Sequence, residues 1–297
     1  MRSKIVLGTR GSKLAMRQTE LVREALMQVY PTLDVEIKVI STKGDRDLNM
    51  SLRGQLTKGL FTEEIEAELL SGDIDAAIHS LKDLPVECTA GTCIGAYLKR
   101  ADTSEVWIGH HHLRDLPAGS VVGTSSHRRA FQLLSKYPHL EIRDIRGNVE
   151  TRIRKFQEGL YDGILMAKAG IDRLGLGGHI REIIAEDTIV PAPGQGAIAV
   201  HIRDNDEELK DVLAQINDHT TEREVITERT ILSLLGGGCA LPFGCRCHYS
   251  HGTYHILAFF SDETGQVTHR AEQTIEEGDY LRQINYLVDT LKSNIQG

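Results

Sequence analysis

A single cysteine, Cys239, stands in the stretch GGGCALPFG between three glycines and a proline. It has no partner at the spacing of a metal site. A cysteine in so flexible a loop is either a small apolar residue or a nucleophile held where another molecule can reach it. The stretch alone leaves both interpretations open.

Arginines gather in one part of an otherwise acidic chain. The 297 residues carry a formal net charge of -8, whereas residues 128–154 hold seven basic and three acidic residues, a local net charge of +4. The overall charge argues against a general nucleic-acid binder, and the basic stretch favours a small anionic ligand. Solvated helix faces are the alternative interpretation of each arginine taken singly.

Two segments of this stretch have the composition of anion sites. In GTSSHRR, residues 123–129, Thr124, Ser125 and Ser126 offer hydroxyls and a helix N-cap, and two arginines offer forked donors that suit carboxylates. RGNVETR, residues 146–152, places two more arginines just after a predicted strand. Two such segments favour a ligand with several carboxylates.

A different pair of charges, Lys82 and Asp83, lies in HSLKDLP between a predicted strand and a proline. A carboxylate near basic groups is suited to stabilising a cation or passing a proton. A loop salt bridge or a helix cap explains the same motif without any chemistry, and the motif by itself does not choose between these readings.

Alternating strand-like and helix-like segments predict the elements that carry these motifs. Short apolar strands recur, and between them apolar residues follow helical spacing, as from Leu14 to Val29. This pattern predicts two similar α/β units, followed by a smaller α+β region. The strands are expected at 4–8, 34–41, 75–80, 120–126, 141–145 and 161–167, then as a pair around 248–261 and 266–275, with helices that include 60–70, 222–235 and 279–294. Ligands of such α/β units usually bind outside the carboxyl ends of strands, which is where the motifs fall.

Nine segments, spread from Ile5 to the last helix, together resemble the porphobilinogen deaminase family, also called hydroxymethylbilane synthases. They stand in the family's order and spacing, which a chance similarity does not explain. The segments are LGTRGSKLAMRQ, STKGDR, KGLFTEEIE, AAIHSLKDLP, VVGTSSHRR, IRGNVETR, AKAGIDRLGL, PAPGQGA and GGGCALPFG. The resemblance implies two periplasmic-binding-protein-like α/β domains that flank a cleft, plus a smaller C-terminal α+β domain. We expect the domains at 1–98 with 196–215, at 99–195 and at 216–297.

The resemblance also implies a covalent role for Cys239. In this family the loop cysteine holds, through a thioether, a dipyrromethane that the enzyme builds from its own substrate and keeps as a primer. Four porphobilinogen molecules are joined, each with loss of ammonia, and water releases the linear hydroxymethylbilane. Every pyrrole carries an acetate and a propionate, so the growing chain accumulates the carboxylates that a basic cleft would bind.

Site residues follow from the same resemblance, motif by motif. Asp83 is the implied catalytic residue, because it would accept hydrogen bonds from pyrrole N–H groups and stabilise the cationic intermediates. The implied cofactor contacts are Cys239, Lys82, Asp83, Thr124, Ser126, Arg128, Arg129, Arg146 and Gln195. The implied substrate contacts are Arg10, Gln18, Lys58, Arg146, Arg152 and Arg173.

Two positions depart from the family pattern. His127 replaces a usually aliphatic residue and is expected to pack against a neighbour. Ser104 and Glu105 replace a common Arg-Asp pair, which puts the details of the hinge between the first two domains in question.

Other classes of protein fit the sequence less well. The histidine and cysteine runs lack regular zinc-ligand spacing, so we expect no metal. The scattered cysteines and the lack of an apolar leader favour a cytoplasmic protein, and the resemblance implies a monomer with neither nucleic-acid nor membrane partners. A two-lobed module that binds or senses a small carboxylate remains the alternative, because it would use the same arginines without Cys239 or Asp83.

Overall fold

The computed structural model describes residues 2–42, 62–237 and 241–296. The chain forms two compact units, residues 1–101 with 197–222 and residues 102–196 with 223–297. In the described part of the chain, no helix is both long enough and apolar enough to cross a membrane.

The first unit is built on a five-stranded sheet with the order β2-β1-β3-β10-β4. β1, β2 and β3 run parallel, and β10 enters antiparallel between β3 and β4. The elements are β1 (Lys4–Arg10), α1 (Lys13–Val29), β2 (Asp34–Ile40), α3 (Glu63–Ser71), β3 (Ala76–Ser80), the 3-10 helix η1 (Leu81–Asp83), β4 (Thr92–Tyr97), β10 (Ile198–Arg203) and α7 (Glu207–Ala214).

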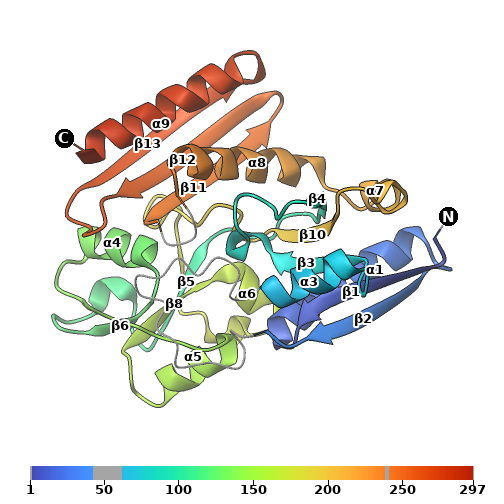
Figure 1. Cartoon of the computed structure of the whole chain (residues 1–297). Coiled ribbons are helices and arrows are strands. Elements are labelled where there is room, and N and C mark those ends of the chain that lie inside the picture. Colours follow the sequence, from blue (N-terminus) through green and yellow to red (C-terminus); the bar gives the residue numbers. More distant parts are fainter. Residues whose placement is uncertain (1, 43–61, 238–240, 297) are drawn as a thin grey trace. The chain divides into compact units, whose positions relative to one another are not determined.

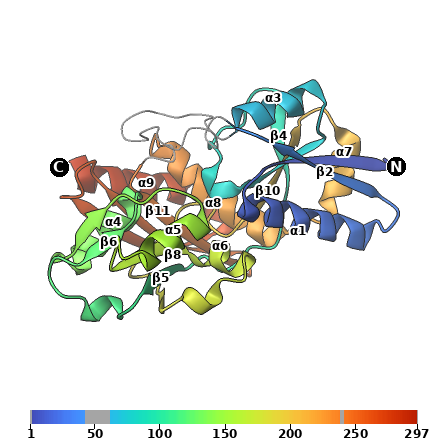
Figure 2. The same ribbon diagram turned by 90° about the horizontal axis from the view of Figure 1, so that it is seen from below.

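Helices cover both faces of this sheet, as Figure 2 shows. α1 and α7 bury Val22, Leu26 and Leu209 against Leu7 and Ile78 on one face. α3 covers the other face with an apolar cluster of its own. Because both faces of the sheet are covered, the central strand β3 begins with the uninterrupted apolar run Ala76, Ala77 and Ile78, whereas the edge strand β2 keeps the charged residues Glu36 and Lys38.

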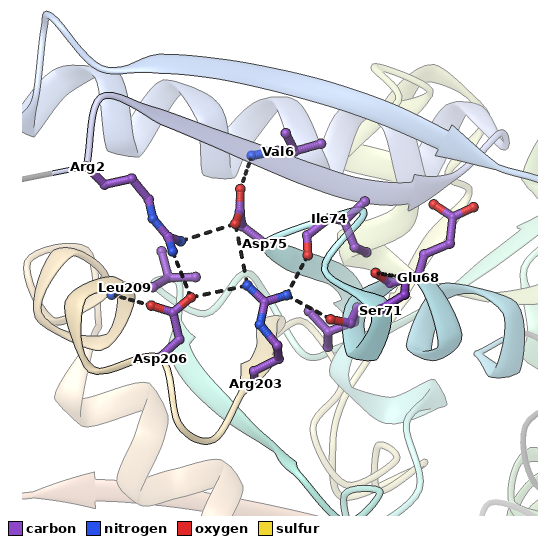
Figure 3. A network of polar contacts seen from close by, with 10 residues as sticks. Arg2, Val6, Glu68, Ser71, Ile74, Asp75, Arg203, Asp206 and Leu209 are labelled. Atoms are coloured by element: carbon purple, nitrogen blue, oxygen red, sulfur yellow. Dashed lines mark hydrogen bonds and ion pairs between the residues drawn. The ribbon is translucent and has the colours of Figure 1, made fainter.

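An ionic network fastens the amino-terminal edge of the same sheet (Figure 3). Arg2 and Arg203 both bind Asp75 and Asp206, at N–O distances between 3.0 and 3.5 Å. Asp75 also accepts the backbone N–H of Val6 at 2.8 Å. Two arginines shared between two partly buried carboxylates hold the start of β1, the start of β3 and the end of β10 together.

The second unit contains a five-stranded sheet with the order β7-β6-β8-β5-β9. β6, β7 and β8 run parallel, and β5 is antiparallel to β8 and β9. Its elements are β5 (Glu105–Gly109), η2 (Leu113–Asp115), β6 (Val121–Gly123), α4 (His127–Lys136), β7 (Glu141–Arg143), α5 (Val149–Gln157), β8 (Gly163–Ala167), α6 (Lys168–Arg173), η3 (Gly177–His179) and β9 (Glu182–Ile184). Trp107, fully buried, packs with Val122, Leu133 and Leu165 in the core.

A separate three-stranded antiparallel sheet follows α8 (His219–Leu234). It contains β11 (Phe243–Ser250), β12 (Thr253–Ser261) and β13 (Thr268–Glu276), then η4 (Glu277–Asp279) and α9 (Tyr280–Gln296). In Figure 1, α9 lies along β12 and β13. The sequence predicts two strands in this region, and the structure has three, so the predicted number is wrong. The segment 248–261 turns back at His251 and Gly252, which have φ angles of 49° and 80°.

The α/β fold class with a small C-terminal sheet is confirmed, while the division into three domains stays a prediction. The burial of β2 does not alternate regularly between its two faces. Val35 is buried, but Val39 on the same face is 54% exposed, and Ile40 on the opposite face is buried. β2 is an edge strand, and its far end is covered on the α3 side, where Ile40 joins the apolar cluster.

Candidate functional site

Charged residues of the first unit gather where its parallel strands end. Arg10 is the last residue of β1, and Lys82 and Asp83 lie in η1 directly after β3. Since β1 and β3 are parallel neighbours, these ends share one edge of the sheet. Lys82 is half-buried and Asp83 is exposed. The structure thus brings the predicted catalytic carboxylate and two predicted ligand cations to one edge.

A buried glutamine on α1 forms a hydrogen bond to the end of β3 at this edge. Gln18, on α1, is 3% exposed, and its Nε2 donates to the Ser80 Oγ at 2.7 Å. The Ser80 hydroxyl also lies 3.1 Å from the Gln18 Oε1. Ser80 is the last residue of β3, so this pairing holds the point from which η1 and Asp83 start. The amide of Gln18 is engaged inside the unit, and its contact with substrate stays a prediction.

A buried histidine pair lies next to Ser80. The rings of His79, on β3, and His201, on β10, have centroids 5.9 Å apart, and both side chains are almost fully buried. Burial lowers the pKa of His79 to about 3, and the nearby His201 and Arg10 add to the effect. His79 is therefore neutral at physiological pH in the folded protein.

This neutral histidine predicts acid sensitivity. Unfolded His79 regains its ordinary pKa of 6.5, so between pH 6.5 and about 3 only the unfolded chain takes up the proton. As the pH is lowered through this window, we expect His79 alone to reduce the free energy of unfolding by up to about 1.4 kcal/mol per pH unit. Urea unfolding at pH 7 and pH 5 measures the slope, and H79Q should flatten it. A variant of the exposed His219, H219Q, is the control, and an equal slope in H79Q and wild type would contradict the assignment.

In the second unit, hydrogen bonds join the two arginine-bearing loops. The backbone N–H of Thr124, after β6, donates to the Arg143 carbonyl at 3.0 Å. The Ser125 Oγ donates to the Ile145 carbonyl at 2.9 Å and accepts from the Ile145 N–H at 3.1 Å. GTSSHRR and RGNVETR therefore lie side by side at the edge where β6 and β7 end.

Both loops lead into capped helix N-termini. The Ser126 side chain accepts from the Arg129 N–H at 3.4 Å and caps α4. Asn148 caps α5 through the Thr151 N–H at 2.9 Å. Thr124 is almost fully buried, and its Oγ1 accepts the N–H of Ser126 at 3.2 Å. The positive ends of two helices thus add to the arginines at this edge, which favours a bound anion.

Arg128 and Arg129 share one buried carboxylate, which comes from outside their own motif. Glu105, 0% exposed, accepts from the Arg128 Nη2 at 2.7 Å and from the Arg129 Nη2 at 2.6 Å. Both guanidinium groups are over nine-tenths buried, and burial lowers the pKa of Arg128. Two arginines against one glutamate leave a net charge of +1. The Arg129 Nε, moreover, has no hydrogen-bond partner among the described residues. This arrangement fits an additional bound carboxylate.

The other predicted arginines are partly exposed. Arg146 lies in the loop before α5, and the Arg152 Nε donates to the Gly147 carbonyl at 2.8 Å. Arg173, the last residue of α6, donates through its Nη2 to the Gly196 carbonyl at 2.6 Å. Burial lowers the pKa of Arg173 to about 10. Since its hydrogen-bond partner is a neutral carbonyl, a bound carboxylate would compensate this desolvated cation.

Gln195 is fully buried, with its Nε2 donating to the Thr103 carbonyl at 2.7 Å. His127, as expected, packs, with its ring stacked on Phe131 at a centroid distance of 5.5 Å. Cys239 and Lys58 lie outside the described residues. The roles of all these residues toward cofactor and substrate stay predictions.

The histidines and cysteines near the C-terminus are dispersed in the C-terminal sheet. Cys245 and Cys247 are buried in β11, and burial raises the pKa of the Cys247 thiol. His248 and His255 are cross-strand neighbours on β11 and β12. Within the described ranges, no three histidine, cysteine or acidic side chains form a group that could hold a metal ion.

Each of the two α/β sheets thus carries cations at the carboxyl ends of its parallel strands, an arrangement that suits the binding of an anionic group. The sequence model of a family described as "Porphobilinogen deaminase, dipyromethane cofactor binding domain" matches residues 5–211. The chain belongs to the porphobilinogen deaminase family.

Relatives that carry the name porphobilinogen deaminase match over most of their length. The protein of Chloroherpeton thalassium is 40% identical and aligns over 95% of this chain and 92% of its own. The proteins of Clostridioides difficile and Geobacillus kaustophilus are 43% and 44% identical over 88% of this chain, and 88% and 86% of their own. Among solved structures, the methionine-binding protein MetQ is similar at 13% identity with a TM-score of 0.45, over 80% of this chain and 97% of that one, a likeness too low to bear on function.

Proposed function

We propose that the chain joins four porphobilinogen molecules head to tail, each with loss of ammonia, and releases hydroxymethylbilane by hydrolysis. The observation that supports this most directly is the exposed carboxylate of Asp83. It follows β3 at an edge that also carries Arg10 and Lys82, and a hydrogen bond between buried Gln18 and half-buried Ser80 holds the end of β3 from which η1 starts. An anionic group beside cations suits a reaction in which a carboxylate-bearing substrate becomes cationic.

Asp83 accepts hydrogen bonds from pyrrole N–H groups in this proposal. The carboxylate thereby stabilises the positive charge that develops on the substrate as ammonia leaves. Because Asp83 is exposed, each porphobilinogen molecule can reach it in turn. The proposed ligands of the substrate's acetate and propionate groups are Arg10, Arg146, Arg152 and Arg173, with Gln18 and Lys58 in support.

The residues present fit a dipyrromethane cofactor, whose binding domain the family match covers. The net +1 charge of the buried Arg128, Arg129 and Glu105 group and the orphaned Arg129 Nε call for a carboxylate, which each pyrrole of the cofactor carries. Lys82, Thr124, Ser126, Arg146 and Gln195 complete the proposed contacts. When bound, the cofactor supplies the terminal pyrrole to which substrate units are added. Cys239, which lies beyond the family match, would hold it through a thioether.

The intact mass of the denatured protein tests the covalent attachment. We expect the native chain to carry an added mass of two linked pyrroles and C239S to carry none, because serine lacks the nucleophilic thiolate. Product formation from porphobilinogen should be lost in C239S as well. An unmodified wild-type chain that binds porphobilinogen but does not consume it would contradict the proposal and favour a carboxylate-binding module.

A further inference from the structure

A buried carboxylate on α8 reaches the turn that carries Gln195. Glu228 is 0% exposed, and its Oε2 accepts the backbone N–H of Gly194 at 2.7 Å. Its Oε1 accepts the N–H of Cys247, on β11, at 2.8 Å. Burying a carboxylate is costly, and two charge-assisted backbone hydrogen bonds, with the Arg246 guanidinium 3.8 Å away, offset that cost.

The bond to Cys247 fastens α8 to the C-terminal sheet, but a second carboxylate already does so. Glu224, one helical turn earlier and 4% exposed, accepts the N–H of Tyr249 at 3.1 Å and pairs with Arg246 at 2.8 Å. Glu228 differs from Glu224 in its bond to Gly194. Packing of helix on sheet therefore leaves the Gly194 bond unexplained.

The turn that Glu228 holds is bound on its other side by Arg173. Gly194 and Gly196 have φ angles of 73° and 84°, a conformation that glycine adopts readily, and the Gln195 N–H closes the turn on the Ala192 carbonyl at 2.9 Å. The Gly196 carbonyl accepts the Arg173 Nη2 at 2.6 Å. Only Gln195 lies between Gly194, whose N–H Glu228 fixes, and Gly196, whose carbonyl orients the guanidinium.

We propose that Glu228 is a positioning residue for Arg173. By fixing the N–H of Gly194, it fixes the Gly196 carbonyl, and that carbonyl directs the Arg173 guanidinium toward a substrate carboxylate. In the described part of the chain, Arg173 has no carboxylate partner, so its direction depends on this carbonyl. The inference rests on the proposed function, in which Arg173 binds porphobilinogen.

E228Q removes the carboxylate while keeping its shape, and its amide can accept only one of the two N–H groups. Since a misplacement of 1 Å can cost about 100-fold, we expect the KM for porphobilinogen to rise by roughly 10-fold or more, with kcat changed much less. E224Q is the matched control, because it removes a buried carboxylate from the same helix without touching the turn. Its melting temperature should fall while its KM stays unchanged.

A double-mutant cycle separates positioning from a structural role. If Glu228 acts through Arg173, the KM of R173Q should be raised, and adding E228Q should raise it no further. Independent, multiplicative effects in E228Q/R173Q, or an unchanged KM in E228Q, would overturn the proposal while leaving the proposed function intact. An inactive wild type would instead overturn the function. If E228Q does not fold, E228D, which keeps the charge but shortens the reach, must show the raised KM, and a normal KM there also overturns the proposal.

Discussion

Replacing Asp83 with asparagine should lower kcat by roughly 100- to 1,000-fold while leaving the fold intact, because D83N removes the charge that stabilises a cationic intermediate. Asp83 is exposed in a 3-10 helix, so its contribution to stability is within about 0.5 kcal/mol. The release of ammonia from porphobilinogen measures the effect directly. KM should change little, since the arginines bind the substrate carboxylates.

The chain contains its own control for this variant. The sequence LKDLP at 81–85 recurs as LRDLP at 113–117, and both form a 3-10 helix that ends in an aspartate. Asp115 has a side chain 57% exposed, within 3.7 Å of the Arg114 Nε. D115N makes the same chemical change in the same local structure away from the proposed site, and it should leave kcat unaltered. Equal kcat values for D83N and D115N would show that Asp83 has a structural role in its loop and no role in the reaction.

The arrangement of the motifs was predictable from the order of the elements. Strands that alternate with helices pair in parallel, and parallel strands place their carboxyl ends at one edge. The structure confirms this for β1 with β3 and for β6 with β7. Arg10 and Asp83 therefore share an edge although 73 residues separate them in the sequence. The order of strands and helices was enough here, because the direction of a strand alone decides at which edge of the sheet its following motif lies.

The partners of buried charges were not predictable in the same way. In the sequence, Glu105 stands out only as a departure from the family pattern, yet it is the counter-charge of Arg128 and Arg129, more than 20 residues away. Glu228 belongs to none of the sequence motifs. A glutamate in a sequence looks the same whether it is solvated or buried, because burial depends on how distant elements pack. The available signal was chemical, since adjacent buried arginines require a carboxylate.

The turn in the C-terminal sheet illustrates a different limit. His251 adopts a positive φ of 49° before Gly252, which splits a continuous β-rich stretch into β11 and β12. Positive φ is uncommon outside glycine, so a His-Gly dipeptide inside a β-rich stretch is a weak turn signal. The strand pairing, with Phe243 opposite Phe260, compensates for the strained residue.

Removing the buried carboxylate of Glu105 should strongly destabilise the second unit. E105Q leaves two adjacent guanidinium groups buried with a net charge of +2 in place of +1. We expect the free energy of unfolding to fall by about 3–5 kcal/mol, the usual effect of removing one partner from a buried ion pair. Urea denaturation at pH 7 measures it. The control is E141Q, whose exposed pair with Arg143 at 3.1 Å should contribute less than about 1 kcal/mol.

The same variant also tests whether this cluster accepts an anion. If the cluster is a carboxylate site, removing Glu105 increases its attraction for anions, so the apo C239S/E105Q protein should be stabilised by added acetate more than C239S alone, at constant ionic strength. Ordinary screening by salt would affect both proteins equally. A loss of stability with no difference in the acetate response would mean that Arg128 and Arg129 serve the core of the unit, and the carboxylates of the ligand would then have to be bound by Arg146, Arg152 and Arg173.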